Sequence, residues 1–210
     1  MSSNRGRLVS TFIVGLASAM WGCSSKTPDR VPAPEIDAAA VAAKAIALYD
    51  KNGDGAISGD ELDKCPALKA SLKRYSNGDG KVTAETIAAR MDKIKESKVG
   101  IMTLIAKVTL DGAKVDGATV LLEPEPFFGG SILPASGKTN SEGSASLAID
   151  PEDRFKKGVN PGLYKVRITK QVGGQESIPA RYNKDTELGV EVAQDNMEIQ
   201  SDLHFQLKSR

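Results

Sequence analysis

The hydrophobic pattern of this chain changes its period once, near residue 99. Before that point, apolar residues recur three and four positions apart, the spacing that places them on one face of a helix. The expected helical faces comprise Val41, Ala45, Leu48 and Tyr49, then Leu68 and Leu72, and finally Ile87, Met91 and Ile94. We therefore expect three main helices, the second of which starts at Pro66, where a missing N–H costs nothing.

The second part of the chain alternates apolar and polar residues with a period of two, which is typical of strands with one buried face. The alternating segments cover residues 104–110, 118–122, 145–149, 163–168, 190–192 and 203–207. Asp-Gly, Asn-Pro-Gly and Gly-Gly turns separate them, as in a β-sandwich. The sequence thus predicts an α+β multidomain protein. An all-α unit over 36–98 precedes an all-β, immunoglobulin- or transthyretin-like sandwich over 99–210.

The segment Asp50–Glu61 matches the calcium-binding loop of an EF-hand at every position. Ca²⁺ is a hard cation that takes about six to eight oxygen ligands. The pattern assigns the ligand oxygens to Asp50, Asn52, Asp54, Ala56, Ser58 and Glu61. Ala56 supplies only its carbonyl, Ser58 ligates directly or through a water, and Glu61 closes the loop with both carboxylate oxygens. We predict calcium binding here rather than an acidic turn that binds nothing.

A second loop, Tyr75–Thr86, keeps the glycines and the Asn/Asp pattern but lacks the first and last carboxylates. Tyr75 and Thr86 occupy those two positions. The remaining candidates for a weaker second metal site are Asn77, Asp79, Lys81 and Thr83. We expect this loop to be a structural partner whose Val82 pairs with Ile57. The first half would then be an EF-hand pair with one strong site.

The beginning of the chain has the features of an export signal, expected over residues 1–22. A basic start precedes an apolar stretch over 8–19 that is short for a membrane span. Cys23 then stands where a bacterial lipobox places its acylated cysteine, so we predict lipidation there and a flexible tether over 23–35. Two alternatives stay open: cleavage after Ala19, which would release a soluble secreted protein, and an uncleaved anchor. The predicted location is the cell membrane or outer membrane, facing the periplasm or the cell surface.

Composition argues against nucleic acid as a partner. Without residues 1–22 the chain carries 26 Lys and Arg against 27 Asp and Glu, a net charge of −1. Phosphate backbones and anionic membrane surfaces are recognised by basic patches, which this balance does not favour. Aromatic residues make up 5% of the chain, too few for a broad base-stacking surface.

Catalysis also finds little support in the residues. The single histidine, His204, falls on the outward face of the last predicted strand, with no nucleophile or acid spacing beside it. Cys65 is expected to be a small, partly buried apolar residue rather than a reactive thiol. We therefore predict a non-catalytic protein.

Two loops outside the calcium motif are further candidates. Arg181, Tyr182 and Asn183 could form part of a ligand-binding or interdomain surface, although a demanding loop in which Tyr182 packs and Asn183 makes the turn is the simpler interpretation. Phe127 and Phe128 could form a contact patch or, as we favour, a plug over the open end of the sandwich.

The motifs of the second half carry a resemblance. The segments VTLDGAKVDGATVLLEP, GKTNSEGSASL and PGLYKVRITK resemble the carboxypeptidase regulatory-like (transthyretin-like) β-sandwich. Together with the signal and the loops, the chain resembles uncharacterised bacterial EF-hand lipoproteins. This resemblance implies no catalytic activity and a structural or recognition role for the sandwich.

Two functions remain after these observations. In the first, calcium is a structural brace for a surface-anchored binding or scaffold module whose protein or glycan partner is unknown. In the second, the EF-hand pair is a sensor that opens to bind a partner. A secreted, soluble calcium- or glycan-binding protein is a variant of the first. The single intact loop, the short helices and the 5 methionines favour the brace.

Overall fold

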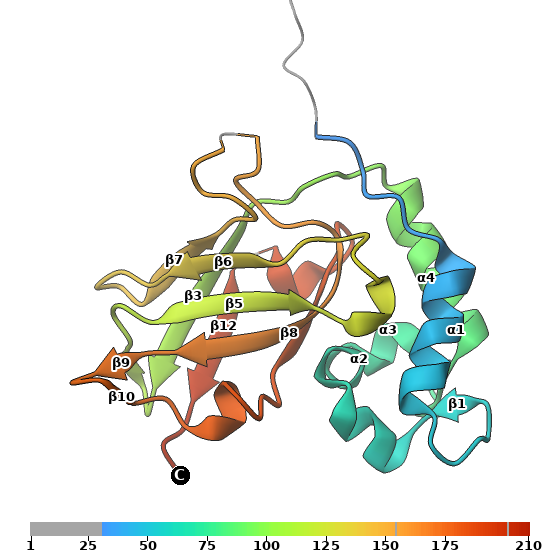
Figure 1. Cartoon of the computed structure of the whole chain (residues 1–210), viewed down its shortest axis with the longest axis horizontal. Helices are drawn as coiled ribbons and strands as arrows, with labels where there is room; N and C mark the ends of the chain where they lie inside the picture. Colours follow the sequence, from blue (N-terminus) through green and yellow to red (C-terminus); the bar gives the residue numbers. More distant parts are fainter. Residues whose placement is uncertain (1–30, 154, 201) are drawn as a thin grey trace, which may run out of the picture.

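The computed structural model describes residues 31–153, 155–200 and 202–210, and it shows a mixed α/β protein with a β-rich second part (Figure 1). We call residues 31–98 the helical half and residues 99–210 the β half. The helical half contains α1 (Ala38–Tyr49), the 3₁₀ helix η1 (Gly59–Lys64), α2 (Pro66–Ala70), α3 (Leu72–Tyr75) and α4 (Ala84–Glu96).

Helix α1 begins where Asp37 accepts a hydrogen bond from the backbone N–H of Ala40 at 3.0 Å, a standard N-cap. Its packed face consists of Ala38, Val41, Ala42, Ala45 and Tyr49. The prediction that Leu48 belongs to this face is wrong, since its side chain is 42% exposed. Three alanines on the packed face let α1 approach its neighbours closely and turn Leu48 toward solvent.

The helix expected to start at Pro66 is two short helices, α2 and α3, separated at Ser71. The two loops of the helical half are joined by a short antiparallel ladder of β1 (Ala56–Ile57) and β2 (Val82–Thr83). Ile57 lies opposite Val82, and both side chains are fully buried, so the predicted pairing is confirmed.

The described residues of the β half form two larger sheets and a two-stranded hairpin. One has the order β11 (Gly189–Val192), β8 (Gly162–Thr169), β5 (Thr119–Pro124) and β6 (Ala135–Lys138), with antiparallel neighbours. The other places β12 (Leu203–Leu207), β3 (Leu104–Leu110) and β4 (Ala113–Lys114) in order, and β7 (Ser144–Leu147) also pairs with β3. Strand β12 runs parallel to β3, and β9 (Gln171–Val172) and β10 (Gln175–Glu176) form a separate hairpin.

The alternation in the sequence predicted six strands correctly, because their apolar residues face a shared interior. Figure 1 shows β5, β6 and β8 in front of β3, β7 and β12. Val108, Val120, Leu122, Val166 and Ile168 are fully buried in the core. Strand β6 was not expected, because its sequence Ala-Ser-Gly-Lys carries no apolar alternation.

The two halves share one hydrophobic core. Helix α2 lies against β11, and an added Cβ on Gly189 would stand 2.3 Å from backbone atoms of Pro66 and Ala67, so only glycine fits there. Phe127 and Phe128 lie in the 3₁₀ helix η2 (Pro126–Phe128) and are buried. Phe127 meets the ring of Tyr49 edge-on at 6.3 Å. The phenylalanines therefore fill the junction beneath α1 rather than form an exposed patch.

A buried ion cluster crosses the same junction. Glu191 of β11 is 1% exposed and accepts hydrogen bonds from Nε and Nη2 of Arg90 on α4, at 2.7 and 2.9 Å. Arg90 also donates to Asp195 at 2.8 and 2.7 Å. Arg74 of α3 lies 3.5 Å from the same Glu191 carboxylate. These contacts orient the helical half on the β half.

We expect Arg90→Met to destabilise the folded chain by about 3–5 kcal/mol, because it removes both Arg90 hydrogen bonds to the buried Glu191 carboxylate and leaves only the longer contact with Arg74. Lys93→Met is the matched control, since the ammonium of Lys93 meets Asp195 at the rim with side-chain exposures of 66% and 43%. Loss of this exposed ion pair should lower the free energy of unfolding by about 1 kcal/mol or less. Urea unfolding of the two variants measures both values, and equal costs would contradict a specific role for the buried pair.

Candidate metal-binding loop

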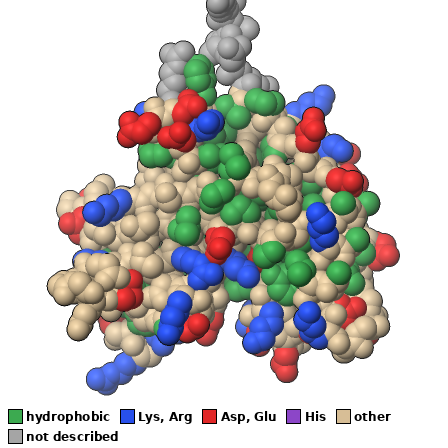
Figure 2. Space-filling model, in the orientation of Figure 1, with side chains coloured by type: hydrophobic (Ala, Val, Ile, Leu, Met, Phe, Trp, Pro, Cys, Tyr) green, Lys and Arg blue, Asp and Glu red, His purple; other side chains and the backbone are tan. Residues whose placement is uncertain are grey.

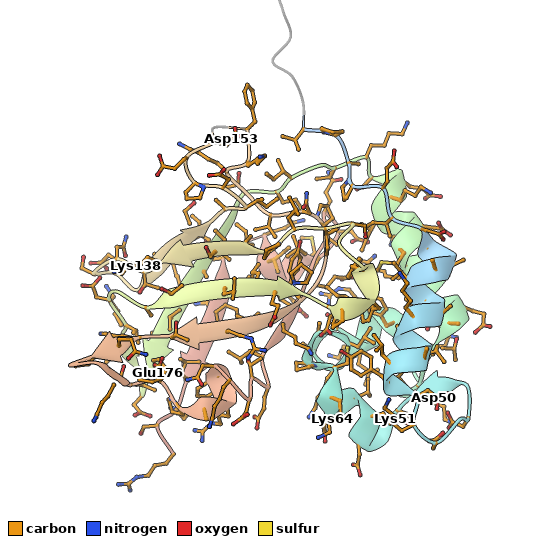
Figure 3. The ribbon with its side chains drawn as sticks, viewed as in Figure 1. Asp50, Lys51, Lys64, Lys138, Asp153 and Glu176 are labelled. Atoms are coloured by element: carbon orange, nitrogen blue, oxygen red, sulfur yellow. The ribbon has the colours of Figure 1, made fainter. Side chains whose placement is uncertain are left out.

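The candidate loop starts at the end of α1. Asp50 is the C-terminal cap of that helix, and Figure 3 shows it at the end of the molecule opposite Asp153. Its two carboxylate oxygens accept hydrogen bonds from the backbone N–H groups of Gly53 at 2.7 Å and Gly55 at 3.0 Å. Gly55 has a φ of +83°, a conformation that side-chain-bearing residues rarely adopt. The first predicted ligand thus organises the turn around itself.

The next two predicted ligands each cap their own turn. Asn52 Oδ1 accepts from the N–H of Asp54 at 2.8 Å, and Asp54 Oδ1 accepts from the N–H of Ala56 at 3.0 Å. Such contacts of an Asn or Asp oxygen with the backbone two residues on are Asx turns. One carboxylate oxygen of Asp54, Oδ2, faces the ammonium of Lys81 in the second loop at 3.5 Å.

Glu61 closes the loop. Its Oε1 accepts from the N–H groups of Lys51 at 2.8 Å and Asn52 at 3.1 Å, and its Oε2 accepts from Ser58 at 3.1 Å. These backbone donors, led by Lys51, hold the pKa of Glu61 below its ordinary value. The last predicted ligand therefore ties the start of the loop to the N-terminus of η1, as a capping-box glutamate does.

The predicted metal-ligand atoms of this loop are all oxygens, which are the ligands that Ca²⁺ prefers. Apart from the contact of Asp54 with Lys81, the hydrogen bonds of the Asp50, Asn52, Asp54 and Glu61 side chains described above are made to backbone N–H groups of the loop. Within the described residues, no three His, Cys, Asp or Glu side chains gather closely enough to hold a metal ion. The structure thus brings the predicted ligands into one folded loop, while each carboxylate still accepts backbone N–H groups.

The second loop uses its corresponding positions in other ways. Thr83 and Thr86 cap α4 reciprocally, with Thr83 N–H donating to Thr86 Oγ1 at 3.0 Å and Thr86 N–H donating to Thr83 Oγ1 at 3.4 Å. Asp79 Oδ1 accepts from the N–H of Lys81 at 3.0 Å. Asn77 lines a surface pocket beside Tyr75 and the Arg90 cluster.

Tyr75 explains why the second loop lacks its first carboxylate. Its side chain is fully buried at the junction of the two halves. Burial, and next the charge of Glu191, raise the pKa of its hydroxyl well above the ordinary value. A carboxylate at this position would add a second buried negative charge beside Glu191, which is costly without a further cation.

A residue that the sequence analysis missed anchors the first loop from the other side. Glu125 is 1% exposed, and its Oε2 accepts a hydrogen bond from the hydroxyl of Tyr49 at 2.9 Å. Tyr49 is the residue immediately before Asp50. The Lys165 ammonium lies 3.8 Å from the same oxygen. The separation of 76 residues between Tyr49 and Glu125 leaves no local sequence signal for this contact.

Cys65 belongs to this buried neighbourhood and is a free thiol. Burial, followed by the nearby charge of Glu125, raises the pKa of the Cys65 thiol, which disfavours the reactive thiolate. It is fully buried rather than partly buried as we expected, and the Glu125 carboxylate lies near it.

The remaining candidates are engaged in the fold. Arg181 donates to the Lys208 carbonyl at 2.6 Å, and Lys208 N–H donates to the Tyr182 hydroxyl at 3.1 Å. Asn183 is buried and donates to the carbonyl of Ile178 at 2.8 Å. These residues fasten a turn and the C-terminal end of the chain, in agreement with the simpler interpretation. His204 is exposed on β12.

No protein-family model matches this chain, and no curated protein or solved structure matches it either. Cys23 and the rest of the expected export signal lie outside the described residues. Across the described part of the chain, no helix has the length and apolarity needed to cross a membrane.

The environment of Glu125 predicts a pH-dependent stability. Burial raises its pKa above the ordinary value of 4.5, so the folded chain binds this proton more tightly than the unfolded chain does. The resulting stabilisation is complete below the unfolded-state pKa and is lost as pH rises through the folded-state pKa.

Glu125→Gln keeps the shape and an acceptor for Tyr49 but cannot ionise. Its free energy of unfolding, relative to that of the unsubstituted chain, should therefore rise as the pH increases above the ordinary pKa of 4.5. Urea unfolding at several pH values measures this difference. A difference that stays level or falls with pH would show that the Glu125 carboxylate is not destabilised by burial.

Proposed function

We propose that the protein binds Ca²⁺ in the loop Asp50–Glu61 and that the ion braces a non-catalytic, exported module. The observation that carries the proposal is the closed loop itself, in which Glu61 reaches back to the N–H groups of Lys51 and Asn52. All the oxygen positions of a calcium loop lie between these two ends. The residues that would hold the ion are Asp50, Asn52, Asp54, Ala56, Ser58 and Glu61.

The donor set favours calcium over transition metals. Carboxylate, amide, hydroxyl and carbonyl oxygens suit hard cations, whereas zinc and copper sites use His and Cys, which this loop lacks. When bound, the ion would draw the negative charges of Asp50, Asp54 and Glu61 to one centre. Ser58 would contribute its hydroxyl or a water, and Ala56 its carbonyl.

The loop is placed where a bound ion would stabilise the junction of the two halves. On its N-terminal side, Tyr49 is hydrogen-bonded to Glu125 of the β half. On its C-terminal side, η1 leads to α2, whose Pro66 and Ala67 contact Gly189 of β11. An ion that orders the loop therefore holds both anchored segments in register, and this supports the interpretation as a brace.

The same contacts argue against a sensor that opens on calcium. The apolar faces that an opening EF-hand pair would expose include Ile57, Leu68, Ile87 and Met91, all fully buried. They belong to a core shared with the β half. We therefore keep the brace as the proposed function of the pair.

Attachment to a membrane through a lipid on Cys23 is the second part of the proposal. Figure 1 shows the chain entering α1 at the end of that helix opposite the Asp50–Glu61 loop. The calcium loop would then face away from the membrane.

The β half, which resembles carboxypeptidase regulatory-like sandwiches, would present a surface to a protein or glycan partner. Figure 2 shows both charge signs interspersed over one face of the molecule, with no broad basic area there.

Calcium should raise the thermal stability of the chain. At a concentration about a hundredfold above Kd, the ion adds about 2.7 kcal/mol. For a protein of this size, that corresponds to a rise in Tm of roughly 5–10 °C. Differential scanning calorimetry with calcium and with chelator measures the shift, with an apolar-surface dye added to detect opening.

Asp50→Ala should abolish the shift, while Asp79→Ala, at the fifth position of the second loop (the counterpart of Asp54), should retain it. An equal shift in Asp50→Ala would disprove the assigned site. Dye binding on addition of calcium would instead favour the sensor.

Lipidation is tested independently. Cys23→Ser should remove labelled fatty acid from the protein in a bacterial host and move the chain from the membrane fraction to the soluble fraction. Unchanged labelling would exclude Cys23 as the modified residue.

A further inference from the structure

The second loop places a positive charge on the first. The Nζ atom of Lys81 lies 3.5 Å from Asp54 Oδ2. Among the described residues, this is the ion pair that joins the two loops. Asp54 is the residue that the calcium pattern assigns to the fifth loop position. Both side chains are partly exposed, at 52% for Lys81 and 38% for Asp54, so the pair is accessible to an incoming ion.

The backbone holds Lys81 at this place from both sides. Its own N–H donates to Asp79 Oδ1 at 3.0 Å. The next residue, Val82, is paired with Ile57 in the β1–β2 ladder and is fully buried. Lys81 occupies the seventh position of its loop, where a calcium loop uses only the carbonyl. The calcium pattern therefore does not use the Lys81 side chain. The β1–β2 ladder brings this side chain close to the first loop.

We infer that Lys81 is a built-in competitor of calcium that lowers the affinity of the first loop. This inference rests on the proposed calcium site. An ion that takes the Asp54 carboxylate must displace the ammonium and then lie near a like charge, and both effects oppose binding. The second loop, whose first and last carboxylates are missing, thus regulates the first loop instead of binding a metal of its own.

The consequence is a site adjusted to high calcium concentrations. Extracellular calcium modules work with Kd values of about 10⁻⁴–10⁻³ M. A competing lysine shifts a loop with a complete set of ligand positions toward that range.

The test compares Lys81→Met with Lys51→Met in the full chain by calcium titration calorimetry. Lys51 lies within the first loop and makes no ion pair with the described residues, so its replacement removes an equal charge without breaking a contact to a ligand. Lys81→Met should lower Kd by about two- to fivefold at low salt, and by more than Lys51→Met does. The difference should shrink at about 0.5 M salt, because ions screen exposed charges.

Lys81→Arg, which keeps the charge, should bind calcium as the unsubstituted chain does. Melting in chelator serves as the second readout and should show that all three variants fold. Equal gains from Lys81→Met and Lys51→Met, or a gain from Lys81→Arg, would overturn the competitor role while leaving the calcium site standing. Absence of calcium binding in the unsubstituted chain and in every variant would overturn the proposed function, and this inference with it.

Discussion

The carboxylate of Glu191 is buried between the two halves of the molecule. Its negative charge is compensated there by ion pairs with two arginines of the helical half. A carboxylate with no cation beside it would be very costly to bury. Arg90 and Arg74 come from different helices, so both α4 and α3 must sit against β11 at one angle. The packing of α2 on Gly189 and of α1 on Phe127 then follows from the same arrangement.

This junction also accounts for the asymmetry of the two loops. A tyrosine stands at the entrance of each loop, and each lies near a buried glutamate of the β half: Tyr49 near Glu125 and Tyr75 near Glu191. In the first loop the tyrosine precedes Asp50, so the first ligand position is still available. In the second, Tyr75 itself takes that position. The tyrosine thus lies one residue earlier relative to the first loop than to the second, and this offset leaves the first loop with all of its predicted ligand positions.

Sequence alone predicts what is local. Apolar alternation predicted strands such as β3 and β8, and the matched loops predicted the pairing of Ile57 with Val82. Strand β6 was missed because its residues carry little apolar pattern, and Leu48 was misplaced because alanines define the packed face of α1. Each ligand position of the calcium-loop pattern in Asp50–Glu61 could be assigned to a residue from the sequence alone.

What the sequence could not predict depends on contacts between distant residues. Glu125 and Glu191 look like ordinary surface carboxylates in the chain. Their partners Tyr49 and Arg90 lie 76 and 101 residues away. The contact of Lys81 with Asp54 follows only once the two loops are paired, because the ladder brings residues 27 apart side by side.

The energies of the junction favour the proposed brace over a switch. Allosteric coupling between sites is typically worth about 1–3 kcal/mol. Opening the helical half would separate Arg90 from Glu191, and breaking a buried pair of this kind costs about 3–5 kcal/mol. It would also expose Ile57, Leu68 and Met91, at roughly 1.5–3 kcal/mol for each large side chain. If the proposed site and the proposed effect of Lys81 hold, one calcium ion would supply too little free energy for that change but enough to stabilise the closed arrangement.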